Sequence, residues 1–301
     1  MGGRPARILL DIDSTDDPTH GHQEGSAYHG YYGQHMYHPL LVFDGDTGQL
    51  ITAILRPGTA HASRGVVAVL RALVRALRAG WPGVAVELRA DSGCAVPRVY
   101  RFCERAHVGY TIGLIPNSRL EAVAAPLLAD AQAQRLATGE PVRLVAEVAY
   151  RADSWDRERR VVYKAEALDK GPNTRFVVTT RADPPDEIYD WYVDRSEAEL
   201  WIKDYKRACV ADRLSDHRFW ANQFRLFLHA AAYWLLDTLR RRLLARGYPP
   251  LQLDTLRLRL LKVGGRVREL ATHVCLHLAS SHPGQFLWDL LAASLPPPHT
   301  A

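Results

Sequence analysis

The sequence predicts an α/β protein in which helices flank a mixed β-sheet. Three observations lead to this prediction. Residues 1–115 alternate strand-like and helix-like patterns, in the order strand, hairpin, helix, strand, helix, strand. Three β-rich segments then lie between about residues 142 and 180, and helical patterns dominate the remainder. Strands that alternate with helices predict a sheet on which the helices pack.

The first strand is predicted by the stretch RILLDIDSTDD, where apolar strand formers run directly into acidic residues. Asp11 and Asp13 share one face of this strand, because side chains alternate along β-structure. A connection rich in Gly and His leads to two apolar runs within residues 40–55. These runs surround a turn rich in Gly and Asp, which predicts a hairpin.

A helix is expected at 64–79, where apolar residues recur at helical spacing. Ser63 can cap its first turn, and Gly80 with Pro82 ends it. The next strand, 84–91, again ends in an acid, Asp91. A short helix at about 96–105 and a third apolar run at 108–115 complete this part of the pattern.

The segment 142–180 predicts three antiparallel strands, which we expect to form an inserted module packed outside the main sheet. A helix then covers 190–206. A second helix, 217–244, carries apolar residues on much of its surface, so we expect it to be largely buried. A hairpin around two glycines is expected within 255–281. The predicted domains are 1–115 (first part of the α/β core), 116–187 (β-rich insertion) and 188–301 (last part of the core and C-terminal helix and hairpin region).

Composition narrows the class of protein. The chain has 301 residues, of which 47% are hydrophobic, so it can bury a sizeable core. Its formal net charge of +5 and its basic side chains, mostly Arg, favour an anionic partner such as nucleic acid; the alternative is that these Arg side chains lie solvated on helix faces. The four cysteines form no CxxC pair and indicate a reducing compartment. No apolar run reaches membrane length, and we expect a soluble cytoplasmic protein.

Acidic side chains at strand ends are the first candidate site. If the strands that end in Asp13 and Asp91 are adjacent and parallel, their carboxylates converge at one edge of the sheet, where α/β proteins bind ligands. A third carboxylate, Glu199, comes from a helix much later in the chain. Three carboxylates repel one another unless a cation neutralises them, and oxygen ligands favour Mg²⁺ or Mn²⁺. The alternative for either Asp taken singly is a turn or helix-cap residue.

A polar stripe on the helix 190–206 is the second candidate. Tyr192, Arg195, Glu199 and Lys206 follow at offsets of three, seven and fourteen residues. At roughly 100° per residue these offsets return to nearly the same side of a helix. The stripe therefore combines a phenol, a guanidinium, a carboxylate and an ammonium. The alternative is a solvated face with intrahelical ion pairs.

These residues carry a resemblance to a known family. The stripe fits the pattern Y-x2-R-x3-E-x6-K, which is a signature of bacterial insertion-sequence DDE transposases. The stretches DST at Asp13 and RADSG around Asp91 resemble the first two motifs of the same group. Longer stretches, LDIDSTDDPTHG, LRPGTAH and ANQFRLFLHAAAYWLL, resemble the subgroup called transposase DDE domain group one. The resemblance extends over nearly the whole chain.

The resemblance implies a ribonuclease H-like catalytic core with a β-rich insertion before the last catalytic helix. It implies two Mg²⁺ (or Mn²⁺) ions held by Asp13, Asp91 and Glu199, with Tyr192 and Arg195 contacting DNA near the scissile phosphate. Lys206 is expected to contact a phosphate at the transposon end. The implied partners are double-stranded DNA, at the transposon ends and the target, and a second copy of the chain in a synaptic complex. The stripe is then expected to face the metal site and the DNA backbone.

Some residues depart from the family pattern or stay open. Asp11 shares a strand face with Asp13 and is either a supporting residue or an alternative ligand. Cys94 follows DSG where relatives have an apolar residue. Six histidines between residues 20 and 61 lack zinc-ligand spacing, so we expect them at the surface or facing DNA. The catalytic strand begins within ten residues of Met1, so the chain is expected to lack the N-terminal region of its relatives.

The predicted function is metal-dependent DNA strand cleavage and transfer of the 3′-OH strand in cut-and-paste transposition of an insertion sequence. The predicted enzyme class is a DNA phosphodiester hydrolase and transesterase, which the missing N-terminal region could leave inactive on its own. The alternative is a truncated, non-catalytic remnant that binds DNA or a full-length transposase.

Overall fold

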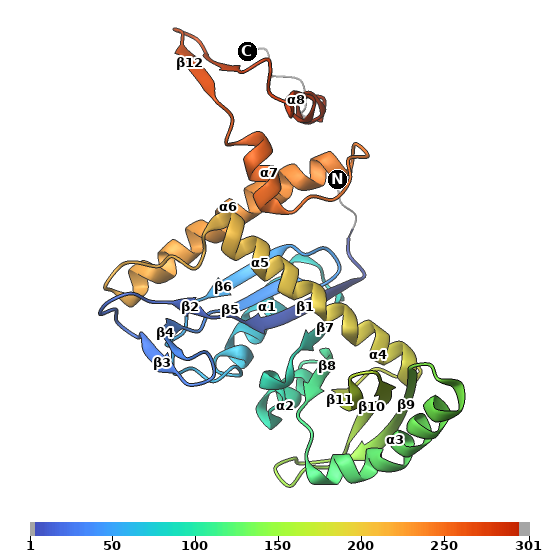
Figure 1. Ribbon diagram of the computed structural model, residues 1–301. Coiled ribbons are helices and arrows are strands. Elements are labelled where there is room, and N and C mark those ends of the chain that lie inside the picture. Colours follow the sequence, from blue (N-terminus) through green and yellow to red (C-terminus); the bar gives the residue numbers. More distant parts are fainter. Residues whose placement is uncertain (1–3, 295–301) are drawn as a thin grey trace. The chain divides into compact units, whose positions relative to one another are not determined.

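An eight-stranded mixed sheet organises the N-terminal unit of the protein, in a computed structural model that describes residues 4–294 (Figure 1). Three neighbouring strands, β1, β7 and β8, run parallel, and every other pairing in the sheet is antiparallel. The strand order is β6-β5-β1-β7-β8-β11-β10-β9. The strands are β1 (Arg7–Ser14), β5 (Leu40–Asp44), β6 (Leu50–Ile54), β7 (Ala85–Ala90), β8 (Gly109–Leu114), β9 (Val142–Tyr150), β10 (Arg159–Leu168) and β11 (Gly171–Thr179).

The predicted order of the first elements is confirmed. Helix α1 (Val66–Gly80) follows the β5-β6 hairpin, and α2 (Pro97–Arg105) connects β7 to β8. The predicted cap of α1 is wrong, because the helix begins after Gly65, which has a positive φ of 82°. The Ser63 hydroxyl instead accepts a hydrogen bond from Arg98 at 2.8 Å, and no side chain caps the first turn of α1.

The β-rich segment extends the main sheet, which corrects the expectation that it packs outside. Its strands are antiparallel, as predicted, but β11 pairs with β8 along the register Phe176↔Leu114 to Thr179↔Thr111. The hydroxyls of Thr111 and Thr179 are buried and hydrogen-bond at 2.7 Å. The backbone groups of β8 that face away from β7 would otherwise lack partners in the core, and β11 satisfies them.

One helix in this region was not predicted. Helix α3 (Ser118–Thr138) starts after Asn117, whose side chain accepts hydrogen bonds from two backbone amides at 3.1 Å, and ends at Gly139, which has a φ of 75°. Only three of its residues are fully buried, and its apolar residues form no single stripe. The helical period is therefore weak in the sequence, although the two caps are standard.

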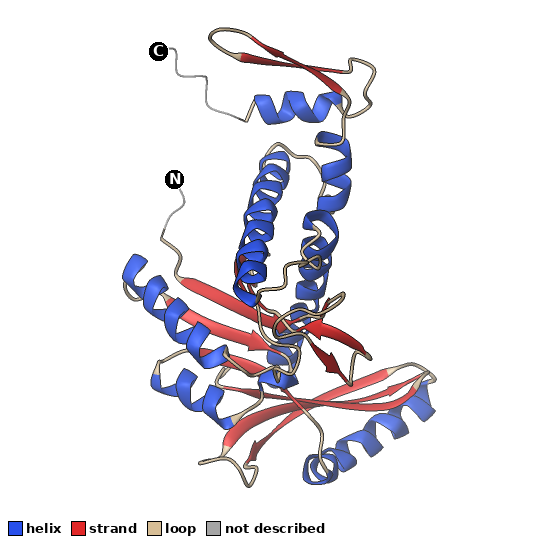
Figure 2. Ribbon diagram, turned by 90° about the vertical axis from the view of Figure 1, so that its left-hand side faces the viewer, coloured by secondary structure: helices blue, strands red, loops and turns tan. Residues whose placement is uncertain are grey.

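The core of the N-terminal unit lies mainly on the face of the sheet that α1, α2 and α3 cover (Figure 2). A second, smaller cluster lies where α4 (Pro185–Val193) packs on the β-rich strands, with Val162 and Val177 against Ile188 and Tyr189. Each fully buried apolar side chain contributes about 1.5–3 kcal/mol. This second cluster fixes α4 to the sheet close to the ends of β7 and β8.

The connection rich in Gly and His folds into a separate small sheet. Its strands are β2 (Asp17–Pro18), β4 (Gln34–Tyr37) and β3 (Ala27–His29), in the order β2-β4-β3. The Gln34 side chain donates a hydrogen bond to Asp16 at 3.0 Å, which ties this sheet to the segment that follows Asp13. Asp16 thus serves the local structure.

The protein divides into two units, Met1–Glu199 and Leu200–Ala301. The C-terminal unit contains most of α5 (Glu197–Cys209), and Asp204 of this helix ties it to the helices that follow. The Asp204 carboxylate accepts from Arg240 at 3.0 Å and from the backbone amide of Leu253 at 3.1 Å. Its further elements are α6 (Phe219–Leu244), α7 (Leu253–Leu260), β12 (Gly265–Glu269), β13 (Val274–Leu278) and α8 (Gln285–Ala292).

Two expectations for the C-terminal unit are wrong. Helix α6 is not largely buried, since Trp220 and Leu235 are 76% and 71% exposed. The hairpin exists, but its turn lies at residues 270–273 and not at the two glycines, because Leu270 and His273 close it with a backbone hydrogen bond of 2.9 Å. The segment before it is helical, as α7.

Candidate active site

Two carboxylates lie at the ends of neighbouring parallel strands. In the β1-β7 pair Ile12 is opposite Ala90, and the residues that follow them in the chain are Asp13, still in β1, and Asp91, directly after β7. The two strands are therefore adjacent and parallel, which is the condition under which the carboxylates of Asp13 and Asp91 were expected to converge. Burial raises the pKa of Asp13 to about 6, the charge of Asp91 adds to this rise, and Arg195 opposes it. The two carboxylates are thus electrostatically coupled.

Asp91 is held by the turn that follows its strand. Its side chain accepts a hydrogen bond from the backbone amide of Gly93 at 3.1 Å, which caps the 3₁₀ turn Ser92–Cys94. A Cβ atom at Gly93 would lie 2.5 Å from the Cβ of Ala62 and 3.1 Å from Asp91 Oδ1. The glycine of the DSG stretch is therefore needed for the close approach of backbone to carboxylate.

Arg195 and Tyr192 approach this pair of acids from the helical segment after the β-rich strands. Arg195 Nη1 donates to Asp13 Oδ2 at 3.0 Å, and its guanidinium lies 6.0 Å from the centre of the Tyr192 ring. The Tyr192 hydroxyl donates a 3.4 Å hydrogen bond to the Ala90 carbonyl. Burial raises the pKa of Tyr192, so the hydroxyl stays protonated. The structure therefore brings together Asp13, Asp91, Tyr192 and Arg195.

The helix predicted at 190–206 is interrupted. Tyr192 lies in α4, Arg195 lies in a 3₁₀ turn (Asp194–Ser196), and Glu199 lies on the first turn of α5 (Glu197–Cys209). A 3₁₀ turn has three residues per turn, so the stripe does not keep the constant angle of a single α-helix. Lys206 lies in the last turn of α5, within the C-terminal unit.

Glu199 is not joined to the two aspartates. It is exposed, and its carboxylate makes no hydrogen bond or ion pair with any of residues 4–294. Within this range no three His, Cys, Asp or Glu side chains are grouped closely enough to hold a metal ion. The predicted third ligand therefore stays a prediction. Of the six histidines between residues 20 and 61, His38 is buried, with Nδ1 2.7 Å from the Ala60 carbonyl oxygen, so the expected surface position is wrong for it.

The chemistry of the two grouped acids fits a hard divalent cation. Asp13 and Asp91 offer only oxygen atoms, which Mg²⁺ and Mn²⁺ prefer. The rise in the pKa of Asp13 reflects burial and the neighbouring charge of Asp91, both of which a cation would offset. Two carboxylates are fewer than the three that the sequence predicted, so Glu199 would have to come closer to complete the set.

Asp11, whose role was open, is a structural partner. Both of its oxygens accept hydrogen bonds from the buried Arg89, at 2.7 and 2.6 Å, and its side chain is fully buried. Arg89 also donates to the Trp191 carbonyl at 2.6 Å and lies 5.0 Å from the Trp191 ring centre. It therefore ties together the strands of both acids and the end of α4. The sequence signal that could have identified Arg89 was its position two residues before Asp91.

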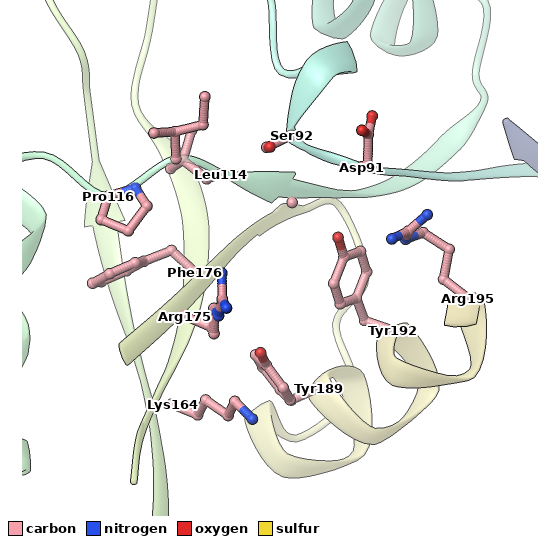
Figure 3. A pocket seen from close by; sticks show the side chains of 12 residues that line it. Asp91, Ser92, Leu114, Pro116, Lys164, Arg175, Phe176, Tyr189, Tyr192 and Arg195 are labelled. Carbon is pink, nitrogen blue, oxygen red and sulfur yellow. The ribbon is translucent and has the colours of Figure 1, made fainter. Parts of the chain in front are cut away.

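A pocket of about 460 Å³ opens beside Asp91 (Figure 3). Tyr192 and Arg195 line it on one side, and residues of β10, β11 and α4 line it on the other. Sequence reasoning missed the second group. Its polar members are Lys164, Arg175 and Tyr189. The missing signal was tertiary, because these residues reach the site only through the pairing of β11 with β8.

Two further features that the sequence raised are the cysteines and the length of the apolar helices. The four cysteines are free thiols, and burial raises the pKa of both Cys103 and Cys209 to about 12. Across residues 4–294, none of the helices combines the length and apolar character that a membrane crossing requires.

Comparison with known proteins agrees with the geometry. The chain matches the family Transposase DDE domain group 1 over residues 3–298. No curated protein matches it. Among solved structures it is similar to one described as a cryo-EM structure of the piggyBac transposase synaptic complex with hairpin DNA, at a TM-score of 0.52 and 11% identity.

That similarity covers 97% of this chain and 58% of the other, so this chain spans little more than half the length of that relative. At this identity the similarity shows the fold alone, and it confirms the predicted ribonuclease H-like mixed sheet flanked by helices. The family match covers almost every residue and contains the three motifs in their expected order. The chain therefore belongs to the DDE transposases of the Transposase DDE domain group 1 family.

Proposed function

We propose that this chain is the catalytic domain of a cut-and-paste transposase of an insertion sequence. The reaction would be hydrolysis of a DNA phosphodiester bond, followed by attack of the freed 3′-OH on target DNA. The observation that carries the proposal is the pair Asp13 and Asp91 at the ends of neighbouring parallel strands, with Arg195 bound to Asp13. Carboxylates with an adjacent guanidinium suit phosphoryl transfer, which depends on charge neutralisation and positioning.

Asp13, Asp91 and Glu199 would hold two Mg²⁺ or Mn²⁺ ions. When bound, such ions help to form the attacking nucleophile and stabilise the leaving oxygen. Glu199 would join the two aspartates through a change at the 3₁₀ turn Asp194–Ser196, which separates it from the sheet-bound α4. Short 3₁₀ stretches within helices often mark functional hinges.

The remaining residues of the stripe would bind the DNA backbone. Arg195 would pair with a phosphate oxygen near the scissile bond, since guanidinium groups bind phosphate in a bidentate manner. The protonated hydroxyl of Tyr192 would donate a hydrogen bond beside it. Lys206 would contact a phosphate at the transposon end. Because phosphate contacts position DNA without reading its sequence, these residues would set register and not specificity.

Double-stranded DNA, at transposon ends and target, is the proposed partner, together with a second copy of the chain in a synaptic complex. The description of the piggyBac structure as a synaptic complex with hairpin DNA supports this proposal by analogy. Sedimentation of the protein with and without DNA carrying the ends of its own element would test it. A particle that stays monomeric with such DNA bound would contradict the homodimer.

The catalytic proposal is tested by nicking of supercoiled plasmid in Mg²⁺ or Mn²⁺. Asp91→Asn and Glu199→Gln should each reduce nicking at least 100-fold, because each removes a metal-binding charge with little change of shape. Glu197→Gln is the matched control, since Glu197 lies in the same turn of α5 as Glu199. Its nicking should equal that of the unsubstituted chain.

Two results would contradict parts of the proposal. If Glu199→Gln nicks as well as its parent, Glu199 is not the third ligand. If the parent binds transposon-end DNA but nicks nothing in either metal, the non-catalytic remnant is the better description.

A further inference from the structure

The wall of the pocket opposite Asp91 is rich in hydrogen-bond donors. It carries the Lys164 ammonium, the Arg175 guanidinium and the Tyr189 hydroxyl, and the near wall adds Tyr192 and Arg195 (Figure 3). The only carboxylate among the lining residues is Asp91. Ammonium and guanidinium groups donate and cannot accept hydrogen bonds, so such a wall suits an anion.

Arg175 is the unneutralised cation of this wall. It lies directly opposite Lys164 in the β10-β11 pair, and like charges placed opposite each other destabilise a sheet. Lys164 is neutralised by Glu166, with its Nζ 2.7 Å from Oε1. Arg175 is exposed and has no hydrogen bond or ion pair within residues 4–294. Its side chain is therefore available to an external anion.

Tyr189 adds a donor at a fixed position. Tyr189 is 3% exposed and belongs to the cluster that fixes α4 to the sheet. The Lys164 ammonium and the Arg143 guanidinium each lie 5.1 Å from the ring centre. Burial raises the pKa of Tyr189, so its hydroxyl stays protonated. Figure 3 shows the Tyr189 hydroxyl directed toward Arg175, and the Tyr192 hydroxyl directed toward the segment that carries Asp91 and Ser92.

We propose that Arg175 and Tyr189 bind a second phosphate of the DNA strand whose scissile phosphate lies at Asp91. This inference rests on the proposed function. The pocket volume of about 460 Å³ suits one unit of a single backbone and not a duplex, so the contact is with one strand. The apolar rim formed by Leu114, Ile115 and Pro116 suits the sugar between the two phosphates. The β-rich strands thereby become part of the substrate site.

The test is DNA binding in EDTA, where no cleavage can occur. Fluorescence anisotropy with a labelled duplex of random sequence gives the affinity across a series of KCl concentrations. Arg175→Ala should weaken binding roughly tenfold and make the slope of log K against log [salt] shallower by about 0.9, the value for one lost phosphate contact. Arg175→Lys should keep the slope, because it keeps the charge. Tyr189→Phe should weaken binding about fivefold without changing the slope, because it removes a neutral donor.

Arg75→Ala is the matched control. Arg75 is exposed on α1, outside the pocket, and its loss changes the net charge by the same amount. Thermal melting of each variant shows that it is folded. The inference is overturned if Arg175→Ala has the slope and affinity of the unsubstituted chain, or if Arg75→Ala changes the slope as much. It is also overturned if Tyr189→Phe and Arg175→Lys both bind like the parent while Arg175→Ala does not, because charge alone would then account for binding.

Two further measurements distinguish DNA from a free anion as the ligand, and distinguish a failure of this inference from a failure of the proposed function. Inorganic phosphate or a nucleoside monophosphate should compete with DNA only weakly. If either binds as tightly as DNA in an Arg175-dependent manner, the pocket serves a free anion and the inference is wrong. An unsubstituted chain that binds no DNA overturns the proposed partner and this inference together. If the chain binds DNA through Arg175 but nicks no plasmid, the result contradicts only the catalytic proposal.

Discussion

The raised pKa of Asp13 predicts how the stability of the protein depends on pH. Its pKa of about 6 lies above its ordinary value of 3.8, so the folded state favours the protonated acid. The stability from this group is complete below pH 3.8 and is lost as the pH rises through about 6. At neutral pH the loss is about 3 kcal/mol. Asp13→Asn should therefore raise the melting temperature of the metal-free protein by several degrees at pH 7.5 and hardly change it at pH 4.

The matched control is Asp16→Asn, since Asp16 lies three residues later and is hydrogen-bonded to Gln34. It should not give the same rise. Adding Mg²⁺ at pH 7.5 should stabilise the unsubstituted chain more than Asp13→Asn, because only the former keeps the charge that a cation would neutralise. A melting temperature of Asp13→Asn that is equal to or below that of the parent at pH 7.5 would contradict the prediction.

The buried pair of Arg89 and Asp11 makes a second prediction at this scale. Removing one partner of a buried ion pair leaves an uncompensated charge, which costs about 3–5 kcal/mol. Arg89→Met should therefore lower the free energy of unfolding in urea by this amount, while the double variant with Asp11→Leu should recover a large part of it. Arg75→Met, at an exposed site, is the control and should change little. Equal losses in the single and the double variant would show that the pair itself is not responsible.

At the scale of elements, the contact between β8 and α4 depends on a glycine. A Cβ atom at Gly113 would lie 2.5 Å from the Tyr192 hydroxyl and 3.1 Å from the backbone nitrogen of Ser92. Gly113→Ala should therefore displace Tyr192, cost about 1–3 kcal/mol of stability and reduce plasmid nicking. Adding Tyr192→Phe removes the hydroxyl and should recover part of the stability, although not the nicking.

Gly80→Ala is the control for this prediction, because nothing lies within 4 Å of a Cβ atom there. Urea unfolding and nicking assays on the same preparations give both quantities. If Tyr192→Phe leaves the stability of the Gly113→Ala variant unchanged, the two side chains do not meet as described.

At the scale of the whole molecule, the division at residues 199 and 200 predicts two unfolding transitions. The N-terminal unit has its own core beneath α1, α2 and α3, and the C-terminal unit buries a separate set of side chains, which includes Leu226, Tyr233 and Leu256. Units with separate cores need not unfold together. Calorimetry should show two transitions, and Asp13→Asn should shift only the one that belongs to the N-terminal unit. A single transition that moves as a whole would contradict this.

The sequence by itself determined the local part of this protein. Short runs of strand-forming residues predicted β1 and β7 and left Asp13 and Asp91 at their ends, because such a run bounded by acidic residues is visible in any short window. The order of the first elements followed for the same reason. The stripe from Tyr192 to Lys206 marked the family through residue identities, although the helix that carries it is broken by a 3₁₀ turn.

Tertiary structure alone decided how these parts combine. The pairing of β11 with β8, the burial of Arg89 against Asp11 and the position of Arg175 in the pocket that Asp91 also lines join residues that lie dozens of positions apart. Local periodicity carries no information about which open strand edge a later strand will meet. That choice depends on hydrogen-bonding groups and apolar faces that find partners only when the whole sheet assembles.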